Sequence, residues 1–249
     1  MRRHGILAIA AAACLAMAAP LGAAEVNLNP DWGDDVYQAP SIFTPDLDAG
    51  ASMKDEIMVT FHGFRSAAPN GAYKRVRKLL RDTHTTIGVN YNYVDVEGTK
   101  ALLEELANGV LKGKRFSTFG TSLGAYWADW FGRTAGAEKI VMINPSVYPA
   151  QHLSKYVGQT LESERRAITF TVSAAQVGRY HGMTSPEVVD TPTLLILSKQ
   201  DDVIDPTVAM ATIAERRGVK TVVFETGGHS LNLKKHPARD EIKAFVTAD

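Results

Sequence analysis

The sequence has almost no cysteine, since Cys14 is the only one in 249 residues. This cysteine lies within an apolar N-terminal run that we expect to be removed, which leaves the remaining chain without a thiol. Disulfides, thiolate metal sites and a cysteine nucleophile are therefore excluded for that remaining chain. An excess of charge of one sign is also missing, because 27 Lys and Arg residues balance 27 Asp and Glu residues. Such a balance does not favour nucleic acid or an anionic membrane surface as a partner.

Long apolar runs are scarce too, and the one that stands out is at the start of the chain. It extends from Ile6 to Ala19, after the basic residues 2–4 and before the small residues 22–24. About 14 apolar residues are too few for a membrane-spanning helix, which needs roughly 20. The pattern is typical of a secretory signal peptide and does not favour a membrane anchor. We expect residues 1–24 to be cleaved after Ala24, which gives a periplasmic or secreted protein.

The expected mature chain suits one domain. It has about 225 residues, enough for a large buried core. Loss of Arg2 and Arg3 leaves 25 basic and 27 acidic residues, a net charge of −2. Residues 25–55 are rich in Pro, Asp and Gly, which indicates an extended N-terminal arm with a short strand at Ile42-Phe43. Residues 56–249 are expected to form the folded domain.

Strand and helix patterns alternate through this domain. Short apolar runs typical of buried strands lie at 57–61, 86–91, 116–119, 139–143, 193–198 and 221–225. Helical patterns lie at 73–82, 99–111, 123–132, 206–217 and 239–248. The alternation predicts the α/β class, with a doubly wound, mostly parallel sheet whose sites form at the carboxyl ends of the strands. Residues 148–190 break the alternation, and we interpret them as a small insertion that acts as a lid.

The motif with the clearest chemistry is Gly120-Thr121-Ser122-Leu123-Gly124, which matches G-x-S-x-G. In this motif the serine sits on a sharp strand-to-helix turn, and the glycines let the two backbones approach closely. The expected strand at 116–119 precedes the motif and the expected helix at 123–132 follows it, as a nucleophile elbow requires. The amide of Leu123 would then stand at a helix N-terminus and face a developing oxyanion.

Three further residues, Phe64, Asp201 and His229, follow predicted strands at positions where a serine nucleophile needs an oxyanion donor, an acid and a base. His62-Gly63-Phe64 closes the first strand of the domain, so the Phe64 amide could be a second oxyanion donor. Asp201 follows the strand at 193–198, and His229 follows the last strand in a Gly-Gly turn. The chain order serine, acid, base is that of α/β-hydrolases. We therefore predict that Ser122, Asp201 and His229 form a catalytic triad.

Alternatives to Asp201 exist within the same loop. Asp202 is its neighbour and is expected to be a solvated charge, whereas Asp205 precedes Pro206 and is expected to cap a helix. The other histidines receive non-catalytic interpretations. His62 is expected to brace the oxyanion loop, and the remainder lie in polar surroundings that predict surface positions: His84, His152, His181 and His236.

Beyond the bare elbow, longer segments carry a resemblance to a known family. They are 119–131 around the elbow, His62-Gly63-Phe64, the Asn-Pro segment 143–149, the acidic segment 196–205 and Gly227-Gly228-His229. Over roughly residues 56–247 the chain resembles the YqiA/YcfP-like esterase family of α/β-hydrolases. The resemblance implies esterase activity on acyl esters or thioesters, with Ser122, Asp201 and His229 in the triad positions. Members of that family are cytoplasmic, so the expected signal peptide is a departure from it.

The sequence thus predicts an exported serine esterase that cleaves a small acyl ester or thioester and needs no metal or organic cofactor. One rival is another hydrolase, such as a lipase, thioesterase or peptidase, which a panel of substrates would separate. A second rival is a non-catalytic exported binding or assembly protein on an α/β-hydrolase scaffold. A fluorophosphonate probe, which labels an activated serine, would distinguish it. The sequence leaves the oligomeric state open.

Overall fold

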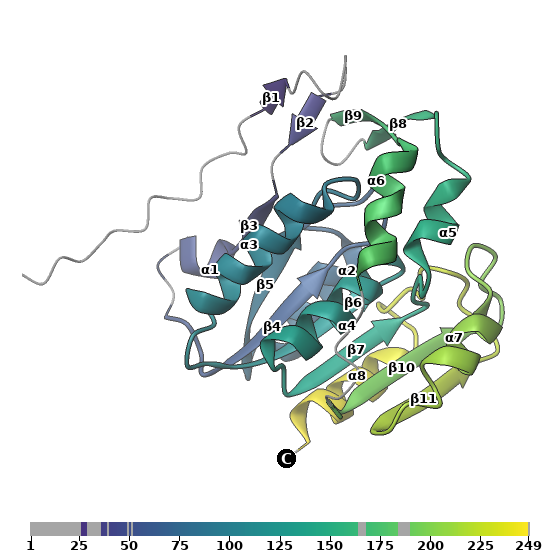
Figure 1. Cartoon of the computed structure of the whole chain (residues 1–249). Helices are drawn as coiled ribbons and strands as arrows, with labels where there is room; N and C mark the ends of the chain where they lie inside the picture. Colours follow the sequence, from purple (N-terminus) through teal and green to yellow (C-terminus); the bar gives the residue numbers. More distant parts are fainter. Residues whose placement is uncertain are drawn as a thin grey trace, which may run out of the picture.

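The computed structural model describes residues 26–28, 36–38, 40–48, 50, 52–163, 168–183 and 190–248. A seven-stranded sheet forms its centre, in the order β11-β10-β7-β6-β4-β5-β3 (Figure 1). All neighbouring strands are parallel except β3, which runs antiparallel to β5 at one edge. The predicted signal peptide, residues 1–24, lies outside the described residues. Among the described residues, no helix is both long and apolar enough to cross a membrane.

The elements of the sheet and its covering helices follow the predicted alternation closely. The sheet strands are β3 (Ser41–Phe43), β4 (Glu56–Phe61), β5 (His84–Asn90), β6 (Arg115–Thr121), β7 (Lys139–Ile143), β10 (Thr193–Ser198) and β11 (Val219–Phe224). The helices are α1 (Pro45–Asp48), α2 (Gly71–Leu80), α3 (Val96–Asn108), α4 (Leu123–Ala135), α7 (Pro206–Thr212) and α8 (Ala238–Thr247). The short strand predicted at residues 42–43 is present as β3.

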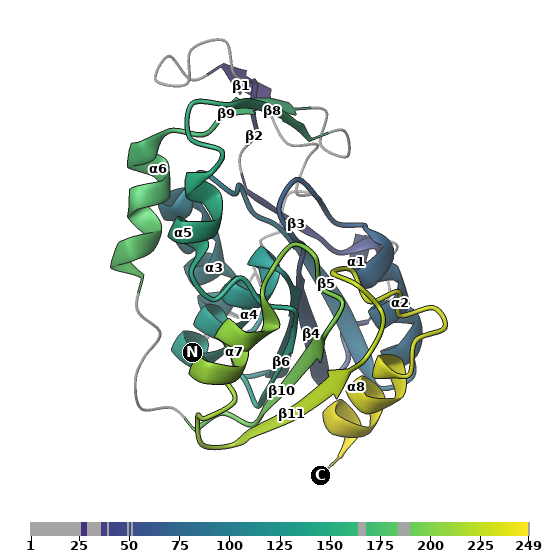
Figure 2. The ribbon, with the colours of Figure 1, turned by 90° about the vertical axis from the view of Figure 1, so that its right-hand side faces the viewer.

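Helices cover both faces of the sheet, as a doubly wound fold requires. Figure 2 shows α3, α4 and α7 on one side of the strands and α2 and α8 on the other. Successive side chains of β4 point to opposite faces of the sheet. Ile57 and Val59 pack with α3 and α4, whereas Met58 packs with α2 and α8. Apolar side chains therefore fill two cores, one on each side of a sheet that is buried at its centre.

Helix α7 is shorter than the sequence pattern predicted. It ends at Thr212, although the apolar spacing suggested a helix to Arg217. After it, the N–H of Ala214 bonds back to Ala209 and that of Arg216 bonds to Ile213, so the chain tightens into turns. Arg216 then reaches Asp129 of α4 in an ion pair of 2.8 Å. Asp129 is buried, and this tertiary contact decides the end of the helix over its local pattern.

His84 corrects a second expectation, because the structure buries it. It is the first residue of β5 and is 6% exposed, with its Nδ1 atom 2.8 Å from the Thr83 hydroxyl. Burial and the nearby Lys139 lower the pKa of His84 to about 4. The polar neighbours in sequence misled the prediction, since alternate residues of a strand inside a sheet are covered whatever the polarity of their neighbours. His181, in contrast, is exposed as expected.

The segment that interrupts the alternation forms a small subdomain beyond the sheet. It contains α5 (Pro149–Ser154), the antiparallel hairpin β8 (Thr160–Ser163) and β9 (Ile168–Thr171), α6 (Ala174–Arg179) and the short turn η2 (Tyr180–Gly182). Buried Phe170 and Val177 join the core that α3 and α4 form. The N-terminal arm adds the strand pair β1 (Val26–Leu28) and β2 (Val36–Gln38), which lies beside this hairpin (Figure 2).

Candidate active site

Strand β6 and helix α4 meet at Ser122, which has a φ of 56° and a ψ of −124°. Residues other than glycine rarely adopt a positive φ, so this turn is strained and must be held by its surroundings. The Ser122 N–H donates to the Ile143 carbonyl at 2.9 Å, and the Ser122 carbonyl accepts the N–H groups of Ala125 and Ser146, each at 3.0 Å. The backbone on both sides of the serine is thereby fixed, and the turn has the form that a nucleophile elbow needs.

The two motif glycines make this turn possible. A Cβ atom on Gly120 would lie 2.1 Å from the carbonyl oxygen of Gly124, and one on Gly124 would lie 2.3 Å from that of His62. Either contact is with backbone, so a larger residue at either position would force the strand and the helix apart. The close approach also places the end of β4 directly beside the serine.

Asp201 and His229 come together although 28 positions separate them in sequence. The Nδ1 atom of His229 lies 2.9 Å from Oδ1 and 2.8 Å from Oδ2 of Asp201. The Asp201 side chain is only 1% exposed, whereas that of His229 is 20% exposed. The loop after β10 wraps around the carboxylate, because the N–H groups of Val203 and Ile204 both donate to its Oδ1 at 2.9 Å. A buried, fixed carboxylate on Nδ1 leaves the Nε2 atom of the ring available for a proton.

Asn144 holds the turn that carries His229, a role that the sequence did not reveal. Its side-chain amide donates to the carbonyls of Gly228 at 3.1 Å and His229 at 2.8 Å. Its side-chain oxygen accepts the N–H of Ser198 at the end of β10. Asn144 itself has a φ of 43°, which asparagine tolerates better than most residues. One side chain therefore links the ends of β7 and β10 to the histidine turn. The Asn-Pro segment carried the family resemblance and was the signal that could have pointed to it.

We predict that Asn144→Asp lowers kcat for a simple ester by roughly 10- to 100-fold, because small displacements of a catalytic group cost about that much. The aspartate still accepts from Ser198 but places an oxygen against the Gly228 and His229 carbonyls. Steady-state kinetics with thermal unfolding as a check on folding will measure the effect, and KM should change much less than kcat. Asn232→Asp is the matched control, since the side-chain oxygen of Asn232 accepts the Lys234 N–H within its own loop, a bond that an aspartate keeps. A folded Asn144→Asp protein with wild-type kcat would remove this role.

The predicted oxyanion donors lie on the two sides of Ser122. Leu123 is the first residue of α4, so its N–H has no acceptor within the helix. The N–H of Phe64 has no acceptor in the part of the chain that the structure describes. Its loop is adjacent to the serine, because a Cβ atom on Gly63 would lie 3.5 Å from the Cβ atom of Ser122. Two backbone donors beside one hydroxyl are what an oxyanion hole requires.

His62 braces the loop that carries Phe64. Its imidazole is 2% exposed and stacks on the ring of Tyr91 at 4.3 Å between centroids. Its Nδ1 donates to the carbonyl of Gly63 at 2.8 Å, and the Tyr91 hydroxyl donates to the carbonyl of His62 at 2.6 Å. The expectation that His62 supports the loop rather than transfers protons agrees with these contacts.

Ser122 and His229 line one cavity of about 680 Å³, and Phe64 also contributes to it. Tyr156 and Glu162 of the inserted segment line the same cavity. The insertion therefore supplies part of the wall around the serine. Within the described part of the chain, the Ser122 hydroxyl makes no hydrogen bond to His229. Such bonds are often long without substrate and tighten only when it binds.

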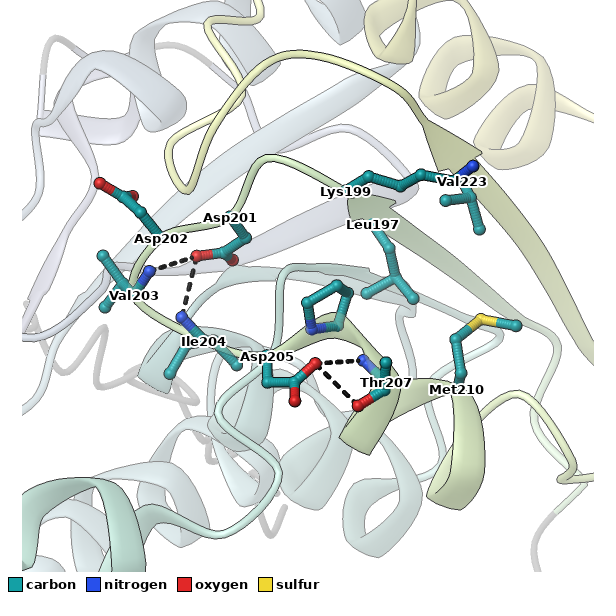
Figure 3. Close-up of a pocket in the computed structure, with 11 residues that line it drawn as sticks. Leu197, Lys199, Asp201, Asp202, Val203, Ile204, Asp205, Thr207, Met210 and Val223 are labelled. Atoms are coloured by element: carbon teal, nitrogen blue, oxygen red, sulfur yellow. Dashed lines mark hydrogen bonds between the residues drawn. The ribbon is translucent and has the colours of Figure 1, made fainter.

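The other two acids of the loop have the positions that the sequence predicted for them. Asp205 caps α7, where its carboxylate accepts the N–H of Thr207 at 2.9 Å and its hydroxyl at 2.7 Å. These bonds lower the pKa of Asp205, with the hydroxyl bond the larger cause. Asp202 is exposed. Figure 3 shows Asp205 turned to Thr207 and Asp201 turned to the amides of Val203 and Ile204.

A second cavity, of about 770 Å³, lies between the Asp201 loop, α7 and β11 (Figure 3). Its walls are largely apolar, and they include Leu197, Met210 and Val223. Neither a serine nor a histidine lines it. Asp201 contributes to its wall, whereas Ser122 and His229 line the other cavity.

His152 corrects the expectation of a surface histidine. It is half-buried on α5 of the insertion, and its Nδ1 atom lies 2.7 Å from the hydroxyl of Ser146. Burial, with Lys155 and His229, lowers the pKa of His152, while Asp201 opposes the shift. Since the Ser146 N–H bonds to the Ser122 carbonyl, the pair connects the insertion to the elbow. His236 is also half-buried and packs edge-on against the Phe224 ring at 4.5 Å.

The described residues contain no group of three or more histidine, cysteine, aspartate or glutamate side chains placed to hold a metal ion. The groups gathered at the elbow are instead a hydroxyl, an imidazole, a carboxylate and backbone amides. This set is the one that acyl transfer through a serine uses.

The part of the chain that forms this site matches a known protein family. Residues 57–247 match the uncharacterised protein family UPF0227. The chain belongs to this family. It is the YqiA/YcfP family that the sequence resembles, so that prediction is confirmed. Among curated proteins, none matches this UPF0227 chain significantly.

Solved structures share the fold of this UPF0227 member. Est1E from Butyrivibrio proteoclasticus is 14% identical, with a TM-score of 0.60, over 78% of this chain and 88% of its own. Mouse alpha/beta hydrolase domain-containing protein 10 is 13% identical, with a TM-score of 0.60, over 86% of this chain and 96% of its own. The monoacylglycerol lipase of Paleococcus ferrophilus is 15% identical, with a TM-score of 0.57, over 83% of this chain and 95% of its own. The predicted α/β-hydrolase fold is therefore confirmed.

Proposed function

We propose that this protein is a serine hydrolase that cleaves carboxylic esters or thioesters through an acyl-enzyme intermediate. The observation that carries the proposal is the hydrogen bond between His229 and the buried Asp201, in a histidine that shares its cavity with Ser122. The positive φ of Ser122 adds to it, because strain of this kind persists where a turn has a function. The neighbouring folds named above include an esterase and a lipase, which agree with this reaction class.

In the proposed mechanism each group has one step. Ser122 Oγ attacks the acyl carbonyl carbon while His229 Nε2 takes the hydroxyl proton, since Nδ1 is engaged by Asp201. The Phe64 and Leu123 amides donate to the oxyanion that forms. His229 then gives the proton to the leaving oxygen or sulfur, and the carbon–oxygen or carbon–sulfur bond breaks. A water, deprotonated by the same imidazole, releases the acid and restores the serine.

The experiment for this proposal is covalent labelling. The purified protein, treated with a fluorophosphonate, should gain one adduct, and peptide mass spectrometry should locate it on Ser122. Ser230 lines the same cavity and is exposed, so Ser230→Ala is a useful control that should retain the adduct. A protein that stays unlabelled, or that is labelled elsewhere, would favour the non-catalytic binding protein instead.

Export is the second part of the proposal. We propose that the N-terminal apolar run directs the chain out of the cytoplasm and is removed. Expression of the full chain in a bacterium should yield mature protein in the periplasm or medium that begins at or near Glu25, as N-terminal sequencing can establish. Replacing two apolar residues of the run with arginine should keep the chain in the cytoplasm. Intact protein that begins at Met1 and stays in the cytoplasm would contradict the proposal.

A further inference from the structure

The cavity of Ser122 has charged walls, which a site for purely apolar esters would not need. Two arginines, Arg65 and Arg75, line it, together with a single acid, Glu162. Neither the exposed Arg65 nor the half-buried Arg75 forms an ion pair with any residue that the structure describes. The walls around the serine therefore carry one net positive charge, apart from the triad itself.

Arg75 lies against the first turn of its own helix. Its Nη1 atom is 3.0 Å from the point that a Cβ atom on Gly71 would occupy, so the guanidinium folds back towards the start of α2. Asn70 caps one amide there by accepting from Tyr73, and the first turn contains no acidic residue. A guanidinium at this end adds positive charge to the positive end of the helix dipole. Such an arrangement is unfavourable by itself and becomes favourable when an anion lies between the two.

Arg65, which lines the same cavity, is held in place by its backbone and by its side chain. It has a φ of 56°, in a turn where the Ser66 N–H bonds to Gly63. Its Nε donates to the main-chain carbonyl of Glu162 at 2.8 Å. A guanidinium has five N–H donors, so this one bond leaves donors for a ligand.

Positive charge continues past Arg75 outside the cavity. Arg75 and Leu233 also line a neighbouring hollow of about 380 Å³, whose other charged residues are Lys78, Arg81, Asp82, Lys234, Arg239, Asp240 and Lys243. Asp82 pairs with Arg81 and Asp240 pairs with Arg239, which leaves the lysines unbalanced. A field of this sign raises the local concentration of anionic substrates beside the cavity.

We infer that the esters bound at this site carry a carboxylate group, which Arg75 binds with help from Arg65. The inference rests on the proposed esterase function and names its substrate class. A guanidinium matches the two oxygens of a carboxylate in a forked pair. The single net positive charge of the wall balances one carboxylate, whereas a phosphate dianion would exceed it.

The test compares pairs of esters that differ only in the acid. For an acid in the acyl part, the pair is mono-4-nitrophenyl adipate and 4-nitrophenyl hexanoate. For an acid in the leaving part, it is 4-acetoxybenzoate and its methyl ester. In one of the two pairs, the wild-type kcat/KM should favour the anionic ester by about tenfold or more. Arg75→Gln should abolish this preference and raise KM for the anionic ester. Arg75→Lys, which keeps the positive charge, should retain part of the preference.

Lys74→Gln is the matched control, because Lys74 is exposed on the same helix and does not line the cavity. It should keep the wild-type ratio. A wild-type preference for the neutral ester in both pairs, or equal losses in the two glutamine variants, would overturn the inference while ester hydrolysis itself stands. Equilibrium binding of mono-4-nitrophenyl adipate to the Ser122→Ala protein, with and without Arg75→Gln, decides the inference even if neither ester is hydrolysed. Tighter binding of inorganic phosphate than of adipate would also contradict it.

Discussion

Ser122→Ala should lower kcat by about 10⁴-fold or more, the loss typical when a hydrolase nucleophile is removed. Alanine removes the hydroxyl of residue 122 and keeps the backbone that Ile143, Ala125 and Ser146 hold. Alanine keeps the Cβ atom that strains this turn, so the variant should unfold at a temperature close to that of the wild type. Binding of an ester that is no longer hydrolysed should survive.

Turnover of 4-nitrophenyl butyrate, corrected for the spontaneous rate, measures the first effect. The chain contains a second serine–histidine pair, Ser146 and His152, which lies beside the elbow. Ser146→Ala should reduce activity far less than Ser122→Ala, because Asp201 supports His229 and not His152. If the Ser122→Ala protein retained wild-type turnover and Ser146→Ala did not, the nucleophile would be Ser146 and our mechanism would be wrong.

Asp201→Asn should lower kcat by about 10⁴-fold in a protein that still folds. Asparagine has nearly the same shape, and its side-chain oxygen can still accept the N–H groups of Val203 and Ile204. Its amide nitrogen would then face His229 Nδ1 and donate to it. The imidazole would carry its proton on Nε2, the atom that must accept the proton of Ser122. The loss therefore comes from the wrong tautomer rather than from a disturbed loop.

The two neighbouring acids provide controls of the same chemistry. Asp202→Asn changes an exposed charge and should be nearly silent. Asp205→Asn should keep most of the activity, because asparagine also caps a helix and can accept from Thr207. Kinetics and thermal unfolding of the three variants together separate catalysis from stability. An inactive Asp205→Asn with an active Asp201→Asn would place the acid at 205.

Parts of the candidate site could be predicted from sequence where the local backbone geometry requires a particular residue type. Gly120 and Gly124 could be interpreted correctly because backbone contacts exclude larger residues there. The order of serine, acid and histidine reflects the order of the strands that carry them. Asp205 could be expected to cap a helix because the residue before a helix-starting proline is a common cap, and it caps α7. These inferences concern local geometry, which the sequence specifies directly.

Other contacts depend on segments that meet only in the folded chain. Asn144 lies 85 positions from His229, and no residue pattern around it specifies that its amide supports the histidine turn; the family resemblance of the Asn-Pro segment is the one signal there. His152 was expected at the surface, yet α5 carries it against Ser146. The end of α7 was misplaced because the ion pair of Arg216 with a buried aspartate outweighs the helical pattern. In each case a residue far away in the sequence determines the position of the side chain or the end of the helix. The periodicity of apolar residues does not reveal such long-range contacts.

The side chain of Asn144 has a consequence for the time at which activity arises during synthesis. Its bonds join the strand before residue 144 to the ends of segments that the ribosome makes much later, at Ser198 and at Gly228-His229. A nascent chain that already contains Ser122 thus lacks both the proposed base, His229, and the contacts that orient it. Under the proposed mechanism the hydrolase activity would be latent until the C-terminal region has joined the sheet, much as a zymogen is latent until it is cut. A chain that ends before β11 should be inert towards esters, even though its nucleophile is complete.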